Sequence, residues 1–150
     1  MFCSCAITHG APPNTSVCPV CLGHPGALPV VNDTAVRLAV CAGQALGCSV
    51  QNDSIFARKH YFYPDLPKGY QISQFDQPIC VGGALHCEIE GRQHRFELER
   101  IHMEEDAGKL THDGDRSLVD WNRGGTPLIE IDGRPDIPSA AAAEAWMRML

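Results

Sequence analysis

Long apolar runs, an export signal and an excess of positive charge are all missing from this 150-residue chain. No apolar run approaches the roughly 20 residues of a membrane-spanning helix, and the first residues lack the charge and apolar stretch of an export signal. Lysine and arginine total 12 against 18 acidic residues, a formal net charge of -6, so broad binding to a nucleic-acid backbone is not expected of this chain alone. We therefore expect one soluble, cytoplasmic domain without DNA or membrane partners, or a protein of the organellar matrix in a eukaryote.

The two common nucleotide-binding motifs are also absent. The chain has no Gly-x-x-x-x-Gly-Lys phosphate loop and no Gly-x-Gly-x-x-Gly element, which excludes P-loop ATPases and dinucleotide enzymes. The pairs Gly82-Gly83 and Gly124-Gly125 would let a ligand approach the backbone closely, but such pairs are more typical of turns. Any nucleotide must therefore be held by other groups.

Cysteine, by contrast, is abundant: the chain has eight and carries no export signal. Reducing compartments keep thiols free, so a disulfide scaffold is not the first expectation. Four cysteines fall within the first 21 residues: Cys3, Cys5, Cys18 and Cys21. A Cys-x-x-Cys turn that contains proline directs two sulfurs at one metal, and four thiolates can enclose zinc tetrahedrally. The alternatives are free structural cysteines, disulfides, or a site in which His9 or His24 replaces one cysteine.

The first 29 residues contain too much proline and glycine for a long helix or a central strand. We expect residues 1–29 to be a loop region that bound zinc keeps ordered. A helix is predicted over about 34–46, with cap residues at 32–34 and Gly47 after its end. Ser139 caps a second, alanine-rich helix that reaches the last residue.

Alternating apolar and polar residues predict a β-hairpin with Gly91 at its turn. The first strand begins near Leu85, and the second should run to about Met103. A bulge is expected where the apolar phase of the second strand changes, between Leu98 and Ile101. After a turn rich in glycine and aspartate, shorter strands are predicted at 117–120 and 127–131.

Residues 61–70 mix four aromatic residues with two prolines and a glycine. This composition predicts an ordered loop rather than a helix or strand. Because aromatic rings are costly to leave in water, we expect these rings to be covered.

Three acidic residues, Glu104, Glu105 and Asp106, end the second hairpin strand and could hold a hard divalent cation such as Mg²⁺. Neighbours in a strand point to opposite faces, so Glu104 and Glu105 cannot both reach one ion unless the chain bends. Glu105 shares its phase with Ile101 and Met103, and a carboxylate on that covered face needs a metal or a donor. A solvated turn is the alternative interpretation.

Lys59 and Lys68 flank the aromatic loop and are two of only three lysines in the chain. Lysine binds phosphate as a compact positive charge, so a pair beside an acidic metal site favours phosphoryl chemistry. Two ordinary surface lysines are the alternative.

Taken together, these residues resemble the B subunit of the aspartyl-tRNA(Asn)/glutamyl-tRNA(Gln) amidotransferase, the GatB family. The related archaeal GatE protein has a similar pattern over this span. The resemblance covers nearly the whole chain, and the matching runs lie at residues 2–5, 13–15, 17–23, 63–74, 100–102, 104–109, 120, 122–123, 127–131 and 135–136.

This resemblance implies an ATP-dependent enzyme that phosphorylates the side-chain carboxylate of Glu-tRNA(Gln) or Asp-tRNA(Asn). Ammonia from glutamine, made by the partner amidase (A) subunit in a complex with the small (C) subunit, then displaces the phosphate. The implied fold is α+β, an antiparallel sheet with flanking helices in a glutamine synthetase-like catalytic (cradle) domain. Residues 1–150 would form an incomplete domain of this type, with residues 1–29 as its zinc loop.

The resemblance also assigns roles to residues. Glu105, with Glu104 beside it, would hold Mg²⁺, and Lys59 and Lys68 would face the phosphates of ATP. Tyr70 and Arg123 would help to bind the nucleotide. The four cysteines Cys3, Cys5, Cys18 and Cys21 would hold structural zinc.

One departure from the family pattern limits what we expect of the chain. The family normally begins with a strand that carries Glu-Val-His, which also serves the metal, and this chain starts just after it. The helical and tail domains that contact tRNA are also outside it. We therefore expect the isolated chain to be inactive, with mischarged tRNA bound mainly by the missing domains. A non-enzymatic zinc-loop binding module is the competing interpretation.

Overall fold

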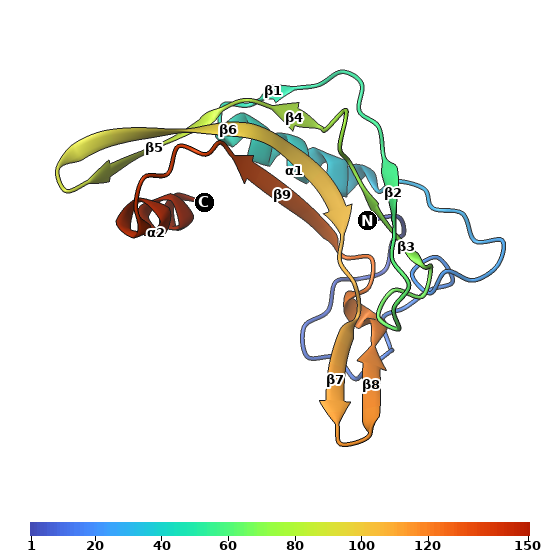
Figure 1. The fold of residues 1–150 in the computed structure, drawn as a ribbon. Coiled ribbons are helices and arrows are strands. Elements are labelled where there is room, and N and C mark those ends of the chain that lie inside the picture. The colour runs from blue at the N-terminus through green and yellow to red at the C-terminus, as the bar shows by residue number, and fades with distance from the viewer.

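The computed structural model describes residues 1–150, and its centre is a curved antiparallel sheet (Figure 1). Four strands pair in the order β1, β4, β6, β5, and β9 also pairs with β6. The sheet comprises β1 (Ser49–Val50), β4 (Cys80–Val81), β5 (Ala84–Ile89), β6 (Arg92–Glu105) and β9 (Pro127–Gly133). β6 is the longest strand, and it connects the hairpin end of the molecule to the acidic residues at 104–106.

Two small hairpins lie near the C-terminal end of β6. They are formed by β2 (Ala57–His60) with β3 (Tyr70–Ser73), and by β7 (Lys109–Asp113) with β8 (Arg116–Asp120). A short 3-10 helix, η1 (Trp121–Arg123), leads from β8 towards β9. Figure 1 shows both hairpins projecting from the same end of the sheet, opposite the tip of the β5–β6 hairpin.

The predicted β5–β6 hairpin and its bulge are confirmed. Glu90 and Gly91 form the turn with φ of 51° and 75°, the left-handed pair that suits a two-residue hairpin connection. The β6–β9 register shifts between Leu98 and Arg100, where the bulge was expected. Two residues on each side of this shift are buried, Phe96 and Leu98 before it and Ile101 and Met103 after it. The bulge therefore carries Glu105, which has the same phase as Met103, onto the buried face.

Both predicted helices are confirmed. α1 (Asp33–Ala45) is capped by Asn32, whose Oδ1 accepts a hydrogen bond from the Thr34 amide at 2.9 Å, and Gly47 follows its end with φ of 68°. α2 (Ala140–Met149) is capped by Ser139, whose Oγ accepts from the Ala142 amide at 3.2 Å. Neither helix is long and apolar enough to cross a bilayer.

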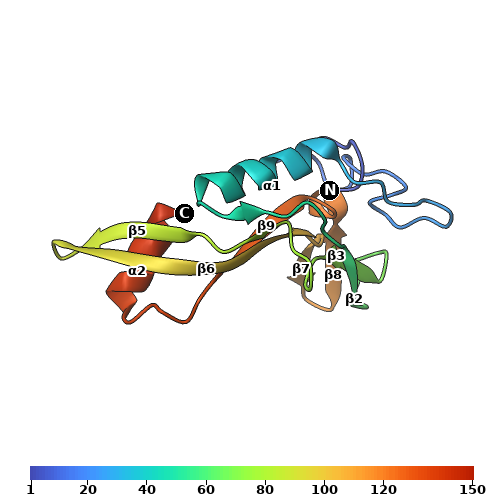
Figure 2. The same ribbon diagram turned by 90° about the horizontal axis from the view of Figure 1, so that it is seen from above.

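The two helices cover different parts of the sheet (Figure 2). α1 packs its small residues Ala35 and Ala39 against the centre, in a core formed with Ile72, Ile79, Cys80, Ile101 and Met103. A Cβ at Gly43 of α1 would lie 2.3 Å from Cys80 Sγ, so glycine permits this close packing. α2 packs on β5 in a smaller core of Cys87, Phe96 and Ala142.

Several elements differ from the sequence predictions. The short strands β1 to β4 were not predicted, and β7 occupies part of the segment that was expected to be a turn. The expectation that the 61–70 rings are covered is wrong for three of them, since Phe62 is 84% exposed and Tyr61 and Tyr63 are also exposed. These rings lie in the β2–β3 connection, where the Tyr61 and Tyr63 centroids are 5.9 Å apart. Phe62 stacks instead on His60 at the end of β2.

Candidate functional site

The sulfurs of the four N-terminal cysteines lie together, although Cys3 and Cys5 precede Cys18 and Cys21 by a long loop. Cys21 Sγ is 3.4 Å from the Sγ atoms of Cys3 and Cys18, and 3.7 Å from that of Cys5. Zinc–sulfur bonds of about 2.3 Å give sulfur–sulfur edges of about 3.8 Å in a tetrahedron, so the cluster fits a metal of this size. These four residues could therefore bind a metal ion, and neither His9 nor His24 belongs to the cluster.

Backbone hydrogen bonds close the Cys-x-x-Cys turn. The Leu22 amide donates to the Cys18 carbonyl at 3.0 Å, and the Gly23 amide donates to Val20 at 3.1 Å. Burial acts to raise the pKa of Cys18, but the Cys21 amide and the neighbouring thiols outweigh it and lower that pKa to about 7. Burial raises the pKa of Cys5 to about 11 and also raises that of Cys21. A bound cation would favour the thiolate form of all four.

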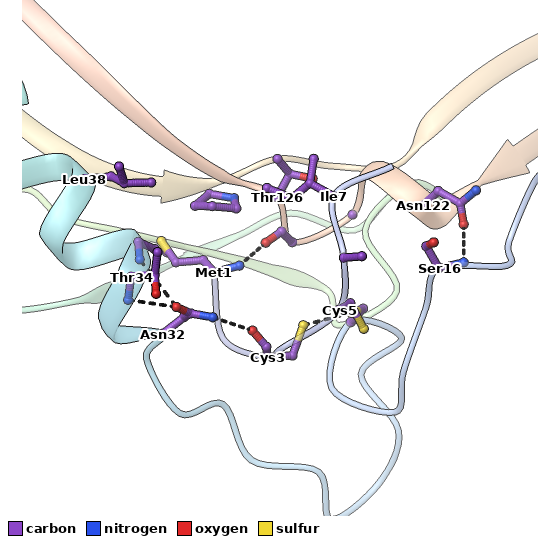
Figure 3. A pocket seen from close by; sticks show the side chains of 16 residues that line it. Met1, Cys3, Cys5, Ile7, Ser16, Asn32, Thr34, Leu38, Asn122 and Thr126 are labelled. Atoms are coloured by element: carbon purple, nitrogen blue, oxygen red, sulfur yellow. Dashed lines mark hydrogen bonds between the residues drawn. The ribbon is translucent and has the colours of Figure 1, made fainter. Parts of the chain in front are cut away.

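Polar contacts join the cysteine loop, residues 1–29, to β8 and η1. The Asn14 amide donates to Asp120 Oδ1 at 3.0 Å, and Asn14 Oδ1 accepts from the Trp121 amide at 2.8 Å. The Ser16 amide donates to Asn122 Oδ1 at 2.8 Å, a contact drawn in Figure 3. The Asn122 and Asn14 amide hydrogen bonds lower the pKa of Asp120. The loop is therefore attached to the sheet end that carries the acidic residues.

Glu105 and Lys68 form a buried ion pair. Lys68 Nζ donates to Glu105 Oε1, and the two side chains are only 8% and 2% exposed. The same oxygen accepts a hydrogen bond from the Ile72 amide of β3 at 2.9 Å. The rings of Tyr70 and Phe2 lie 5.3 and 5.9 Å from Lys68 Nζ. A charged pair this deeply buried is tolerated because each member has a partner of opposite charge and the carboxylate has a second donor.

Two glutamine side chains fix β3 against β6 where no strand ladder joins them. Gln71 Nε2 donates to the Glu105 carbonyl at 2.8 Å, and Gln74 Oε1 accepts from the Met103 amide at 3.0 Å. Gln74 is itself buried. These side-chain bonds set the position of Lys68 and β3 relative to Glu105, and sequence analysis gave no signal for them because glutamine is common on surfaces.

Glu104 lies in a second cluster, with His102 and Glu130. One ligand atom from each of the three residues lies within 4.8 Å of the others, and His102 Nε2 is 3.5 Å from Glu130 Oε2. His102 and Glu104 are alternate residues of β6 and so share a face, and His102 is directly opposite Glu130 in the β6–β9 register. Burial and the charge of Glu130 raise the pKa of Glu104. A nitrogen and two carboxylates grouped in this way could hold a divalent cation.

His102 and Glu130 were not predicted as members of this cluster. The signal that could have found them is the pairing of two predicted strands, 96–103 and 127–131, but their register was not predicted. His102 is also notable because its buried Nδ1 makes no hydrogen bond and lies 3.9 Å from Asp132.

The other three predicted site residues, Lys59, Tyr70 and Arg123, lie around these two clusters. Lys59 lies on β2, where it is exposed and opposite Gln71. It makes no ion pair with Glu105. Its charge partly offsets the effects of burial and Glu130 that raise the pKa of Glu104. Tyr70 begins β3 next to Lys68. Arg123 pairs with Asp106 at 2.9 Å. The structure therefore brings Lys68, Tyr70 and Glu105 together, and sets Glu104 in a neighbouring group.

A cavity of about 140 Å³ lies between the cysteine loop, the start of α1 and the segment 122–127 (Figure 3). Its lining includes Cys3, Cys5 and Asn32, and Asn32 Nδ2 donates to the Cys3 carbonyl at 2.9 Å. None of the lysines or glutamates described above lines it. The cavity therefore belongs to the packing of the cysteine loop and not to the acidic clusters.

Comparison with known proteins matches the whole chain to one family. The family model of the GatB/GatE catalytic domain matches residues 1–150. The B subunits of the aspartyl/glutamyl-tRNA(Asn/Gln) amidotransferases of Persephonella marina and Geotalea uraniireducens are 55% and 56% identical to the chain over 149 and 155 residues. These matches cover 99% and 100% of the chain but only 31% and 32% of the relatives, so the chain spans about a third of their length.

Proposed function

This chain belongs to the GatB/GatE catalytic domain family, and from that premise we propose that it is part of the site where a tRNA-dependent amidotransferase activates and amidates a mischarged amino acid. In this proposal residues 1–150 are an incomplete cradle-type catalytic domain of the glutamine synthetase kind. The substrate is Glu-tRNA(Gln) or Asp-tRNA(Asn), whose side-chain carboxylate becomes an amide.

The proposed chemistry has two steps. An oxygen of the substrate carboxylate attacks the γ-phosphorus of ATP, and ADP leaves with the electrons of the broken P–O bond. Ammonia then attacks the acyl carbon, and phosphate leaves with the electrons of the C–O bond while the new amide loses a proton. A carboxylate is a poor acceptor for ammonia until one oxygen becomes a phosphate leaving group, so positive charge near the transferred phosphate assists both steps.

The residues suited to this chemistry belong to two groups at the C-terminal end of β6, the Lys68–Glu105 pair and the cluster around Glu104. Glu104 and Glu130, with His102, would hold Mg²⁺, which when bound neutralises phosphate charge. Lys59 is also proposed to face a phosphate of ATP, and its charge has a small lowering effect on the pKa of Glu104. Tyr70 and Arg123 stay candidates for nucleotide contact.

Glu105 was predicted from the sequence to bind Mg²⁺, and this stays a prediction. One of its oxygens already accepts hydrogen bonds from Lys68 and the Ile72 amide. We therefore assign Glu105 first to holding Lys68 in place, and Glu104 first to the metal. Lys68 would share its positive charge between this pair and the nucleotide.

The cysteine cluster is proposed to hold a structural zinc ion. The closeness of the four sulfurs and the absence of long elements in residues 1–29 support this role, since a loop of this kind needs a cross-link to stay ordered.

The rest of the machinery is proposed to come from other chains and from segments that the longer relatives carry outside the matched span. Ammonia would come from glutamine through the amidase (A) subunit, in a complex with the small (C) subunit. Contacts to tRNA would lie mainly outside this chain, in keeping with its net charge of -6. A cytoplasmic or organellar-matrix location would suit such an enzyme.

The single observation that supports the proposal best is that the buried Lys68–Glu105 ion pair and the Glu104 cluster lie at the same end of β6. The test is to titrate the chain with ATP, with and without Mg²⁺, while amide signals are followed by NMR. We expect shifts at Lys59, Lys68 and Glu104 only when both are present, and none in a Glu104→Gln variant. Zinc binding with no nucleotide response would instead favour a non-enzymatic zinc-loop binding module.

The chain alone is expected to be inactive. Supplied with ATP, Mg²⁺, ammonia and Glu-tRNA(Gln), it should form no glutaminyl product, because about two thirds of the length of its relatives is outside it. Product formation would show that the other domains are dispensable for the chemistry.

A further inference from the structure

Gly23 of the cysteine loop lies against Lys68 with no room for a side chain. A Cβ at position 23 would fall 2.7 Å from Lys68 Cγ and 2.8 Å from Lys68 Cα. Real Cβ atoms do not come this close to other carbons, and the Gly23 φ of 62° also favours glycine. The backbone just after the Cys-x-x-Cys turn is therefore in direct contact with the stem of this lysine.

Two aromatic rings form the other walls around Lys68. The Phe2 ring lies 5.9 Å from Nζ, is buried, and packs edge-on against Phe56 with centroids 5.5 Å apart. The Tyr70 ring lies 5.3 Å from the same nitrogen. The lysine stem thus occupies a slot, and its ammonium points at the Glu105 carboxylate.

Two walls of this slot are tied to the cysteine cluster. Phe2 directly precedes Cys3, and Gly23 follows Cys21 by two residues. The Sγ atoms of Cys3 and Cys21 are 3.4 Å apart. A metal that joined these sulfurs would therefore also fix the distance between the two walls.

We propose that the cysteine cluster positions Lys68 against Glu105, and that Gly23 is the positioning residue through which it does so. The lysine slot closes when the sulfurs are joined and loosens when they are not. The inference deepens the proposed function, since Lys68 and Glu105 belong to its site, but the contact itself does not depend on which reaction the site performs.

The test compares two glycines of the same loop. Gly23 and Gly26 both have positive φ, at 62° and 82°, so replacing either with alanine introduces similar backbone strain. A Cβ at Gly26 meets nothing within 4 Å, whereas one at Gly23 meets Lys68. The difference between Gly23→Ala and Gly26→Ala therefore isolates the contact with the lysine.

We expect Gly23→Ala to shift the amide signals of Lys68, Gly69 and Ile72 several-fold more than Gly26→Ala does. Ile72 is the most informative of these, because its amide donates to Glu105 and so reports the position of that carboxylate. Equal shifts in the two variants would overturn the assignment of Gly23 as a positioning residue.

A second measurement uses the unmodified chain and applies even if Gly23→Ala fails to fold. Removing zinc with a chelator should shift Lys68 and Ile72 while the β5–β6 turn at Glu90 and Gly91 stays unchanged. Loss of zinc without a shift at Lys68 would overturn the proposal. A chain that binds no zinc at all would overturn the metal's part in it, while the comparison of the two glycine variants would still test the contact.

Discussion

The cysteine loop and the β5–β6 hairpin with α2 lie at opposite ends of the molecule, and different interactions order them (Figure 1). The hairpin end has a regular ladder, a two-residue turn and a small apolar core around Phe96. The loop end has few regular elements, and it contains the cysteine cluster, side-chain hydrogen bonds and the buried Lys68–Glu105 pair. The candidate site lies at the end that depends on polar groups and sulfur.

This difference explains why the two ends should respond to different perturbations. Apolar burial resists changes of metal and pH, since it depends on the area removed from water. A cluster of thiols and charged groups depends on both, because its members must have the correct charge to hold together. Perturbations of one kind should therefore affect one end and spare the other.

The largest effect is expected from Cys18→Ser. Structural zinc contributes about 10–16 kcal/mol of binding free energy in small zinc domains, so losing one ligand should abolish tight binding and disorder residues 1–29. Zinc content and NMR dispersion of the loop signals measure this, with the β5–β6 signals unchanged. The control is Cys41→Ser, which changes an exposed cysteine of α1 outside the cluster and should retain zinc. Full zinc binding by Cys18→Ser would contradict the prediction.

The second-largest effect is expected at the β5–β6 hairpin end of the molecule. Phe96→Ala should cost roughly 3–5 kcal/mol of unfolding free energy, because it leaves a cavity between β6 and α2 in the small core. Urea unfolding measures the loss, and zinc content should not change. If zinc binding fell as well, the two ends would not be independent.

Smaller losses of stability are expected when the cap of either helix is removed, and the two losses should differ. Ser139→Ala removes one capping bond and should cost about 1 kcal/mol. Asn32→Ala removes the cap of α1 and also the bond from Asn32 Nδ2 to the Cys3 carbonyl, so about 2 kcal/mol is expected. Urea unfolding of both variants gives the comparison. Equal losses would show that the contact with the cysteine loop adds nothing.

The smallest effect concerns pH and Glu104. Because burial and Glu130 raise its pKa in the folded state above the ordinary value of 4.5, protonated Glu104 favours folding. This contribution to stability is fully present at a pH below the ordinary pKa of Glu104, and it is lost as the pH rises through the raised pKa of the folded state. Glu104→Gln should therefore gain stability relative to wild type as pH rises through this window, without added Mg²⁺. Thermal unfolding against pH measures this, and a stability difference between the variant and wild type that stays constant with pH would contradict it.

The hairpin end could be predicted from sequence because its signals are local. The Gly91 turn, the phase change after Leu98 and the Ser139 cap each lie within a few residues of the structure they specify. The cysteine cluster was equally accessible, since thiol spacing is a strong pattern.

The rest of the site depends on contacts between distant segments. His102 meets Glu130 only through the β6–β9 register, and Gly23 meets Lys68 only through the path of the loop. The rule that large rings are buried failed for Phe62, because its ring stacks on exposed His60, while Leu66 is the residue of the same connection that is buried. Glu105 was correctly expected on the covered face, but its donors, Lys68 and Ile72, come from a segment more than 30 residues away, and no local pattern names them.

The central claim is that the metal-bound cysteine loop holds Lys68 in its slot against Glu105. Lysine side-chain NMR tests it most directly, because the chain has only three lysines to assign. An ammonium held in a buried ion pair exchanges slowly with water, so we predict a resolved Lys68 Nζ signal in the zinc-bound chain that disappears when zinc is chelated. A Lys68 signal that is unchanged by chelation, or that is absent while zinc is bound, would contradict it.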